Sequence, residues 1–184
     1  MKELPFTVTL RRKSGEEKQF VFRKCERKDL EQLMTVQAAV KAQLARADIF
    51  ATNEREDYLE SFEKDVCLGA FCDGELALCS LMIVNRTTPR HLGNYLGYDE
   101  GLLQRSATYD ITFVHPEYRG FGLQTLGIQI KDKIARELGA EEILATISPY
   151  NVHSLNNAMV QGFEPIKRWQ MYGGMERYIV RKKL

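Results

Sequence analysis

Two pairs of segments with a regular apolar pattern stand out along the first half of the chain. Residues 6–10 and 19–23 alternate between apolar and polar side chains around a Lys-Ser-Gly turn signal, which predicts an opening hairpin. Residues 66–71 and 75–84 are apolar runs on either side of Cys-Asp-Gly, and Asp-Gly is a strong signal for a two-residue hairpin turn. The pattern therefore predicts two antiparallel strand pairs.

Between these two hairpins, apolar residues recur at helical spacing. We expect Asp29 to cap a first helix. A second helix is expected over about 54–63, after the capping residues Thr52 and Asn53. The residues that form the apolar stripes are Leu30, Leu33, Met34, Gln37, Val40 and Leu44 in the first helix and Tyr58, Leu59 and Phe62 in the second.

The second half of the chain begins with a stretch, 85–105, that is rich in Gly, Asn, Arg and Thr and has no sustained period. We expect a long loop with one helical turn there, and loops of this length are often functional. A strand over 107–114, a helix over 123–138 and a strand over 143–147 follow. Because a strand-helix-strand unit normally makes a right-handed crossover, these two strands should lie parallel in one sheet. The helix should end at Gly139 and present on one face Leu123, Leu126, Ile130, Ile134 and Leu138.

A short helix and a hairpin are expected at the end of the chain. The helix begins at Val152 and stops at Gly162. The residues expected to point inward from it are Leu155, Ala158 and Met159. The hairpin covers 164–172 and 175–182, with two consecutive glycines at its turn. The order of elements predicts a mixed α/β sheet, and the length predicts a single domain over 1–184.

The charge balance argues against a large anionic partner. The chain has 26 Lys and Arg against 25 Asp and Glu, a net charge of +1, so no global field favours nucleic acid or an anionic membrane. No run approaches the roughly 20 apolar residues of a membrane span, and the start of the chain lacks the apolar core of a signal peptide. We therefore expect a soluble, cytoplasmic protein with no nucleic-acid or membrane partner.

The cysteines and histidines do not predict a disulfide framework or a metal site. The four cysteines show no C-x-x-C spacing, and three of them fall in expected strands, where free thiols behave as small apolar residues. The three histidines lie far apart in the sequence without an H-x-x-x-H pattern.

The most informative segment runs from Ile111 to Thr125, with the sequence I-T-F-V-H-P-E-Y-R-G-F-G-L-Q-T. An apolar strand ends at a proline, two glycines allow a tight turn, and a helix begins at once. The first N–H groups of a helix have no intrahelical acceptor and carry about half a positive charge from the helix dipole. The segment therefore predicts a strand, an anion cradle and a helix, although a lone Gly-x-Gly before a helix is often only a turn.

The stretch from Val114 to Gln124 resembles motif A of the GNAT N-acetyltransferase superfamily, whose pattern there is Q/R-x-x-G-x-G/A. Arg119 and Gly122 match the first two fixed positions, and Gln124 stands where the family has Gly or Ala. A second segment, Pro149 to Ser154 followed by Gly-Phe-Glu, resembles the family's N-x-x-S/A helix that ends in G-F. The two motifs lie at the family's separation, and the order of elements also agrees.

The resemblance implies a GNAT-like mixed central sheet, mostly antiparallel with a parallel splayed pair, flanked by helices on both faces. It also implies that acetyl-CoA is the co-substrate. The strand that enters motif A would pair with the pantetheine arm, and the glycine loop would hold the pyrophosphate. The cofactor-binding residues implied in this way are Thr112, Phe113, Val114, Arg119, Gly120, Phe121, Gly122, Leu123, Gln124, Thr125, Asn151 and Ser154. Asn151 would also serve as a simple helix cap, Ser154 as a helix-surface residue, and Gln124 as an amide donor to phosphate.

Catalysis needs a base, because an alkylamine with a pKa near 10.4 is neutral only about once in 2,500 molecules at pH 7. The best carboxylate is Asp110, which strand alternation places on the same face as Thr112 and Val114, although a solvent-exposed carboxylate at this position is an equal alternative. Many family members have a Tyr as general acid four residues before the G-F pair, where this chain has Ala158. Tyr150, Tyr172 or water could replace it.

The expected function is an N-acetyltransferase that moves an acetyl group from acetyl-CoA directly to a primary amine of a small molecule or a peptide. In this family the acceptor is bound by the first helices and variable loops, here chiefly 30–63 and 85–105, and the sequence does not select among acceptor classes. The alternative is an acyl-CoA-binding regulatory module of the same fold, favoured by Ala158 and Gln124. Nucleic-acid binding is disfavoured because basic and acidic residues are interspersed. Strand edges in the closing hairpin offer a route to a homodimer.

Overall fold

The computed structural model describes residues 3–184. The strands are β1 (Phe6–Arg11), β2 (Glu17–Lys24), β3 (Val66–Cys72), β4 (Glu75–Val84), β5 (Ser106–Val114), β6 (Glu142–Ile147), β7 (Glu164–Met171) and β8 (Met175–Lys183). The α-helices are α1 (Leu30–Ala42), α2 (Arg55–Lys64), α3 (Glu100–Leu103), α4 (Leu123–Glu137) and α5 (Val152–Val160). Short 3-10 turns are η1 (Arg27–Asp29), η2 (Ala47–Ile49), η3 (Leu92–Leu96) and η4 (Pro116–Tyr118).

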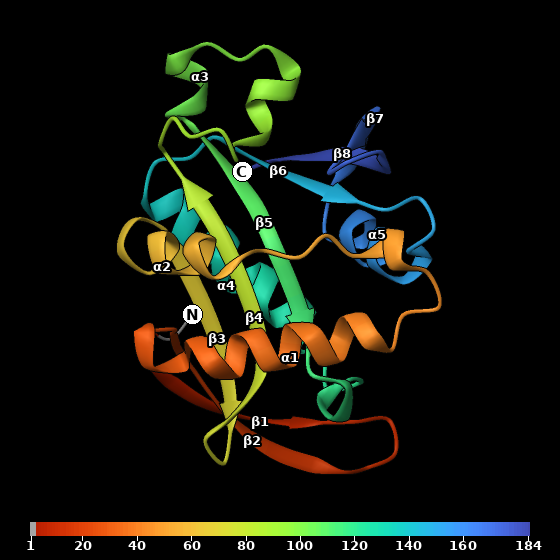
Figure 1. Ribbon diagram of the computed structural model, residues 1–184. Helices are drawn as coiled ribbons and strands as arrows, with labels where there is room; N and C mark the ends of the chain where they lie inside the picture. Colours follow the sequence, from red (N-terminus) through yellow and green to blue (C-terminus); the bar gives the residue numbers. More distant parts are fainter. Residues whose placement is uncertain (1–2) are drawn as a thin grey trace. The chain divides into compact units, whose positions relative to one another are not determined.

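The eight strands form one sheet in the order β1-β2-β3-β4-β5-β6-β8-β7 (Figure 1). The sheet is mixed, as predicted: β5 and β6 are parallel, with Ser106 opposite Glu142 and Tyr109 opposite Ala145. The pairs β1–β2, β2–β3, β6–β8 and β7–β8 are antiparallel. The α4 crossover between β5 and β6 is the element that makes this parallel pair possible.

The chain divides into two compact units. The first unit contains the described residues up to 43, together with 52–81 and 111–131, and the second contains 44–51, 82–110 and 132–184. The elements β4, β5 and α4 each contribute residues to both units. The prediction of a single domain over 1–184 stays a prediction.

The first unit is built on two hairpins that follow the predicted turns. In the opening hairpin, drawn in red in Figure 1, Phe6 lies opposite Phe22, and their rings stack with centroids 5.3 Å apart. The β3–β4 turn has φ of 51° at Asp73 and 84° at Gly74, and positive φ at both central residues is typical of a type I′ hairpin. The fully buried side chains of this unit include Phe20, Phe22, Leu33 and Leu68.

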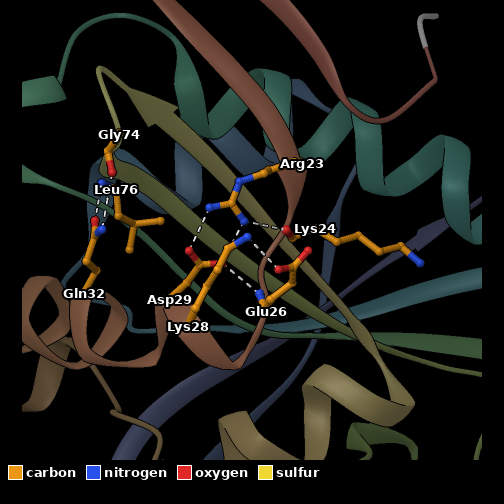
Figure 2. Close-up of polar contacts among 8 residues, drawn as sticks. All are labelled: Arg23, Lys24, Glu26, Lys28, Asp29, Gln32, Gly74 and Leu76. Atoms are coloured by element: carbon orange, nitrogen blue, oxygen red, sulfur yellow. Dashed lines mark hydrogen bonds and ion pairs between the residues drawn. The ribbon is translucent and has the colours of Figure 1, made fainter.

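The start of α1 differs from the predicted cap. Asp29 occupies the N-cap position, but its carboxylate makes no hydrogen bond to the helix. It accepts hydrogen bonds from both terminal nitrogens of Arg23, at 2.7 Å each, and from the Glu26 N–H at 2.8 Å (Figure 2). Burial alone would raise the pKa of Asp29, but these hydrogen bonds outweigh it and the pKa lies below its usual value. The Asp29 carboxylate, which the sequence predicts to cap the helix, therefore binds the Arg23 guanidinium instead.

Gln32 ties α1 to the β3–β4 turn. Its side-chain nitrogen donates to the Gly74 carbonyl at 3.3 Å, and its oxygen accepts the Leu76 N–H at 2.9 Å, as Figure 2 shows. In α2 the cap also differs from the prediction: Glu54, rather than Thr52 or Asn53, is the N-cap, because it forms a reciprocal capping box with Asp57.

The second unit contains the closing hairpin, in blue in Figure 1, and a small apolar core of Leu92, Leu144, Met171 and Ile179. Asp132 links α4 to two strands within this unit: it accepts the Tyr109 hydroxyl at 2.5 Å and the Lys182 ammonium at 2.5 Å. Burial raises the pKa of Tyr109 well above its usual value, so its phenol remains a hydrogen-bond donor.

Three details of the expected elements are corrected by the structure. Leu138 lies beyond the end of α4 and is 50% exposed, because Gly139 ends the helix. Met159 on α5 is 51% exposed rather than inward-facing, whereas Ala158 is buried. The segment 85–105 holds two short helices, η3 and α3, instead of one turn.

The four cysteines are buried, and none of them forms a disulfide among the described residues. Between residues 3 and 184, no helix combines the length and the apolar character that crossing a membrane requires.

Candidate functional site

The C-terminal half of β5 presents two different faces in the first unit. Ile111 and Phe113 are buried at 4% and 3% exposure, whereas Thr112 and Val114 are only partly buried. The Thr112 hydroxyl lies 2.8 Å from the Ser80 hydroxyl, and the buried Lys131 ammonium donates to it at 3.4 Å. The Thr112 side chain is therefore held by two neighbouring side chains.

The turn after β5 is closed by local hydrogen bonds. The Tyr118 N–H donates to the His115 carbonyl at 2.9 Å, and the His115 Nδ1 accepts the Glu117 N–H at 3.2 Å. The Tyr118 hydroxyl donates to Glu75 at 2.8 Å, which anchors the turn to the start of β4. These hydrogen bonds thus fix the backbone of residues 115–118, directly before the glycine loop.

Gly120 and Gly122 have φ of 88° and 77°, in the left-handed region that favours glycine. A Cβ atom placed on Gly122 would meet no atom within 4 Å, so the backbone at Gly122 borders open space. The helix begins directly after it, with Leu126 donating to the Gly122 carbonyl at 3.1 Å. Within residues 3–184, the N–H groups of Gly122, Leu123 and Gln124 donate to no protein acceptor. Free N–H donors at a helix start beside an open glycine fit a phosphate group.

The remaining predicted loop residues surround this cradle. Phe121 and Leu123 are buried at 3% and 1% exposure and hold the loop down. Arg119 is exposed, and its guanidinium lies 3.4 Å from the Gln43 side-chain oxygen. Gln124 and Thr125 are partly buried. The stretch 112–125 therefore forms one local group in the first unit, as the motif predicts.

Sequence reasoning missed the residues that support the loop from the opening hairpin. The Phe20 ring packs against Tyr118 and Phe121, with centroids 5.9 and 5.3 Å apart. The Lys18 ammonium lies 5.5 Å from the Tyr118 ring centroid, and the Arg12 guanidinium lies 4.4 Å from that of Phe121. About a hundred residues of sequence separate the hairpin from the loop, so no local pattern could have predicted these contacts.

Asp110, the predicted base, belongs to the second unit. Its carboxylate forms an ion pair with Arg90, with Nη1 and Oδ2 3.1 Å apart. Both side chains are largely buried, at 13% exposure for Asp110 and 19% for Arg90. The alternative of a solvent-exposed carboxylate does not describe this residue, which is held in one orientation by its partner.

Tyr172 lies near Asp110 in the second unit. Its hydroxyl is 3.1 Å from the Thr146 hydroxyl, and its φ of 52° places a non-glycine residue in the left-handed region. Tyr172 is 43% exposed; desolvation of its hydroxyl and, more weakly, the negative charge of Asp110 raise its pKa, although the contact with Thr146 acts in the opposite direction. A phenol with a raised pKa stays protonated at neutral pH and can donate a proton.

Tyr150 has a different environment. The Arg46 guanidinium covers its ring at 3.6 Å from the centroid, and its hydroxyl donates to Glu176 at 3.2 Å. Ala158, which occupies the usual position of the general acid, is buried at 6% exposure and carries no titratable group.

Asn151 and Ser154 form a helix cap in the second unit. The Asn151 side-chain oxygen accepts the Ser154 N–H at 3.1 Å and begins α5. The capping alternative is therefore realised for Asn151. Its side-chain NH₂ group donates to no acceptor among residues 3–184, so the capping role leaves these donors for a ligand.

Arg177 fastens the segment between α1 and α2 to β8. Its guanidinium, 3% exposed, donates to the Asp48 carbonyl at 2.7 Å and to the Glu176 carbonyl at 2.9 Å. Burial lowers the pKa of Arg177, which has no carboxylate within ion-pair distance among the described residues. Asp48 and Glu176 instead pair with Arg46 and Arg168. A buried cation thus helps to position the 44–51 segment.

Comparison with known proteins finds similarity in structure but not in sequence. No family model matches the sequence, and no curated protein matches it. The fold is similar to that of the acetyltransferase of GNAT family from Streptococcus pneumoniae, at a TM-score of 0.66 and 16% identity over 90% of this chain and 99% of that one. It is also similar to that of yncA from Salmonella typhimurium, a structure determined with its cofactor acetyl-CoA. The TM-score is 0.68 and the identity 16%, over 90% of this chain and 94% of that one.

A third similar structure is the ribosomal-protein-alanine N-acetyltransferase from Brucella melitensis, with a TM-score of 0.66 and 20% identity. The match covers 89% of this chain and 99% of that one. TM-scores at this level establish a shared fold across nearly the whole chain.

Proposed function

We propose that this chain, which has the fold of the GNAT-family acetyltransferases, is an acetyl-CoA-dependent N-acetyltransferase. The observation that carries the proposal is the cradle at the start of α4. There, two glycines with positive φ precede free N–H donors of the helix, beside open space at Gly122. One solved structure of the same fold is described with its cofactor acetyl-CoA.

In this proposal the cradle holds the pyrophosphate. Backbone N–H groups from Gly120 to Thr125 are the donors, and the helix dipole favours the negative charge. Gln124 offers a side-chain amide in place of the close backbone approach that a small residue would give. Backbone groups of Thr112, Phe113 and Val114 bind the pantetheine arm, and Arg119, Asn151 and Ser154 complete the cofactor contacts. These assignments to individual residues are proposals that follow the motif.

Bound acetyl-CoA supplies a thioester whose carbonyl carbon accepts the amine nitrogen. The amine must lose a proton to become nucleophilic, and we assign Asp110 as its acceptor. The ion pair with Arg90 holds the carboxylate in one orientation. The acceptor is a primary amine of a small molecule or a peptide.

The leaving thiolate needs a proton, and Ala158 cannot provide one. Of the two tyrosines near this region, Tyr172 is the better candidate, because its hydroxyl is shared with a neutral threonine rather than directed to a carboxylate. The Tyr150 hydroxyl is already directed to the Glu176 carboxylate. We therefore assign the proton transfer to Tyr172.

The second candidate function is an acyl-CoA-binding regulatory module of the same fold. It is favoured by Ala158 at the usual general-acid position. The two functions differ in turnover: an enzyme releases free CoA thiol from acetyl-CoA in the presence of some amine of a broad panel. The proposed enzyme gives amine-dependent thiol release that is lost in Asp110→Asn, whereas a module gives only the background rate of hydrolysis with every amine.

A further inference from the structure

Arg12 from the opening hairpin lies directly on the glycine loop. A Cβ atom placed on Gly120 would lie 3.7 Å from the Arg12 Cγ and 4.0 Å from its Nε. The guanidinium covers the Phe121 ring at 4.4 Å from the centroid. The planar cation is therefore held against the two residues that precede Gly122.

The hydrogen-bonding capacity of Arg12 is largely unused. Its Nη1 donates to Glu16 at 2.8 Å, but Nε is buried and has no acceptor in the described part of the chain. Nη2 likewise donates to no acceptor among residues 3–184. Guanidinium is a five-donor fork suited to phosphate oxygens, and a buried N–H without an acceptor is costly unless a ligand supplies one.

The present partner of Arg12 is easily exchanged. Glu16 is 41% exposed, and it is shared with Lys18, whose ammonium lies 3.6 Å away. An exposed ion pair of this kind contributes little, because water screens both charges. A carboxylate in this position offers Arg12 the same kind of oxygen acceptor as a phosphate would.

We propose that Arg12 is a phosphate-binding residue for the co-substrate: its guanidinium exchanges Glu16 for an oxygen of the CoA diphosphate held at the glycine loop. This inference rests on the proposed function, because it needs acetyl-CoA at the start of α4. The opening hairpin then has a binding role, and Glu16 acts as an internal competitor that holds Arg12 until the ligand arrives. Removing Arg12 should weaken binding, and removing Glu16 should strengthen it.

The test is isothermal titration calorimetry of acetyl-CoA with the full chain and three variants. Arg12→Gln should raise the Kd about tenfold or more, as expected for loss of a charge-assisted hydrogen bond. Glu16→Gln should lower the Kd about two- to fivefold, the range expected for release from an exposed ion pair. Lys13→Gln is the matched control, an exposed cation of the same turn, and should leave the Kd unchanged.

A second titrant separates the two phosphate sources on the molecule. With 3′-dephospho-CoA, which keeps the diphosphate, Arg12→Gln should weaken binding by the same factor as with acetyl-CoA. An effect confined to ligands with the 3′-phosphate would overturn the assignment to the diphosphate.

The inference and the proposed function fail in different ways. If the unmodified chain binds acetyl-CoA and Arg12→Gln binds it equally well, the role of Arg12 is refuted and the proposed function stands. If the unmodified chain binds no acetyl-CoA, the proposed function fails first. Should Arg12→Gln not fold, Arg12→Lys, which keeps the charge but loses the fork, should still raise the Kd. In that case an unchanged Kd for Glu16→Gln would also refute the exchange.

Discussion

Arg90 holds Asp110 in a largely buried ion pair, with its Nη1 3.1 Å from the carboxylate oxygen Oδ2. The pair joins the stretch 85–105, in which no sustained period is visible, to the strand that enters the glycine loop. The loop after β4 therefore contributes directly to the environment of the proposed base.

Asp110→Asn should lower kcat by about 10²- to 10⁴-fold, the usual contribution of a positioned general base. The Kd for acetyl-CoA should not change, because Asp110 is assigned to the amine rather than to the cofactor. Steady-state thiol release and calorimetry measure the two quantities. Asp99→Asn is the control, since Asp99 caps α3 by accepting the Leu102 N–H at 2.8 Å. A kcat within twofold of the unmodified value would remove Asp110 from the mechanism.

Tyr172→Phe should lower kcat about tenfold or more and leave the Kd for acetyl-CoA unchanged, because it removes only the proposed proton donor. The raised pKa of Tyr172 means that the phenol stays protonated through neutral pH, so the loss of activity that its own ionisation causes should appear only on the alkaline side. The matched control is Tyr150→Phe, which loses its hydrogen bond to Glu176 and should keep its kcat. Equal losses in the two variants would argue against a specific role for Tyr172.

Arg177→Met should raise the KM for the amine while the Kd for acetyl-CoA stays the same. The reason is that Arg177 donates to the Asp48 carbonyl and so positions the 44–51 segment, which lies within the region proposed to bind the acceptor. Arg168→Gln, which removes an exposed ion pair with Glu176, is the control and should leave both constants unchanged. An unchanged KM in Arg177→Met would show that this segment does not contact the acceptor.

Local signals predicted the elements whose geometry is decided locally. Asp73-Gly74 supplies two positive φ values in sequence, so the β3–β4 hairpin follows from its turn alone. The strand-loop-helix order around Gly120 and Gly122 was likewise visible, because glycine at both positions permits the left-handed backbone.

Predictions failed at two helix caps and on one helix face. Asp29 has the sequence position of a helix cap, but its carboxylate accepts hydrogen bonds from Arg23 on β2 instead of from the helix. At α2, Glu54 rather than Asn53 became the cap because it could pair reciprocally with Asp57. Met159 has the spacing of an inward residue but lies on the exposed side of α5.

The candidate site combines a local sequence motif with contacts between residues that are far apart in the sequence. The loop residues were predicted, since consecutive residues carry their motif. The contacts of Arg12 and Phe20 with Phe121 could not be predicted, because they depend on where the sheet places the opening hairpin. The orientation of Asp110 by Arg90 depends in the same way on the path of the chain between β4 and β5.

Asp29→Asn should lower the free energy of unfolding by about 2 kcal/mol at pH 7, because charged hydrogen bonds of this kind contribute about 1.5–3 kcal/mol. The pKa of Asp29 is lowered in the folded state. Its stabilisation is therefore complete above the unfolded pKa of about 3.9 and is lost as the pH falls through the lower folded value. The difference between the two proteins should shrink below about pH 4.

Urea unfolding at several pH values measures this difference. Glu31→Gln, at the exposed pair with Arg55, is the control and should change stability little at any pH. A difference between Asp29→Asn and the unmodified chain that stays constant down to pH 2 would contradict the account of the Arg23–Asp29 pair.

Calorimetric titration of two glycine variants tests whether the glycine loop binds acetyl-CoA. Gly122 and Gly139 both have positive φ, of 77° and 83°, and both border open space, so aspartate at either position brings a similar strain of about 1–2 kcal/mol. Only Gly122→Asp would place a carboxylate against the phosphates. We expect the unmodified chain and Gly139→Asp to bind acetyl-CoA and Gly122→Asp to show no binding. Absence of binding by the unmodified chain at millimolar acetyl-CoA, or equal binding by Gly122→Asp, would contradict this expectation.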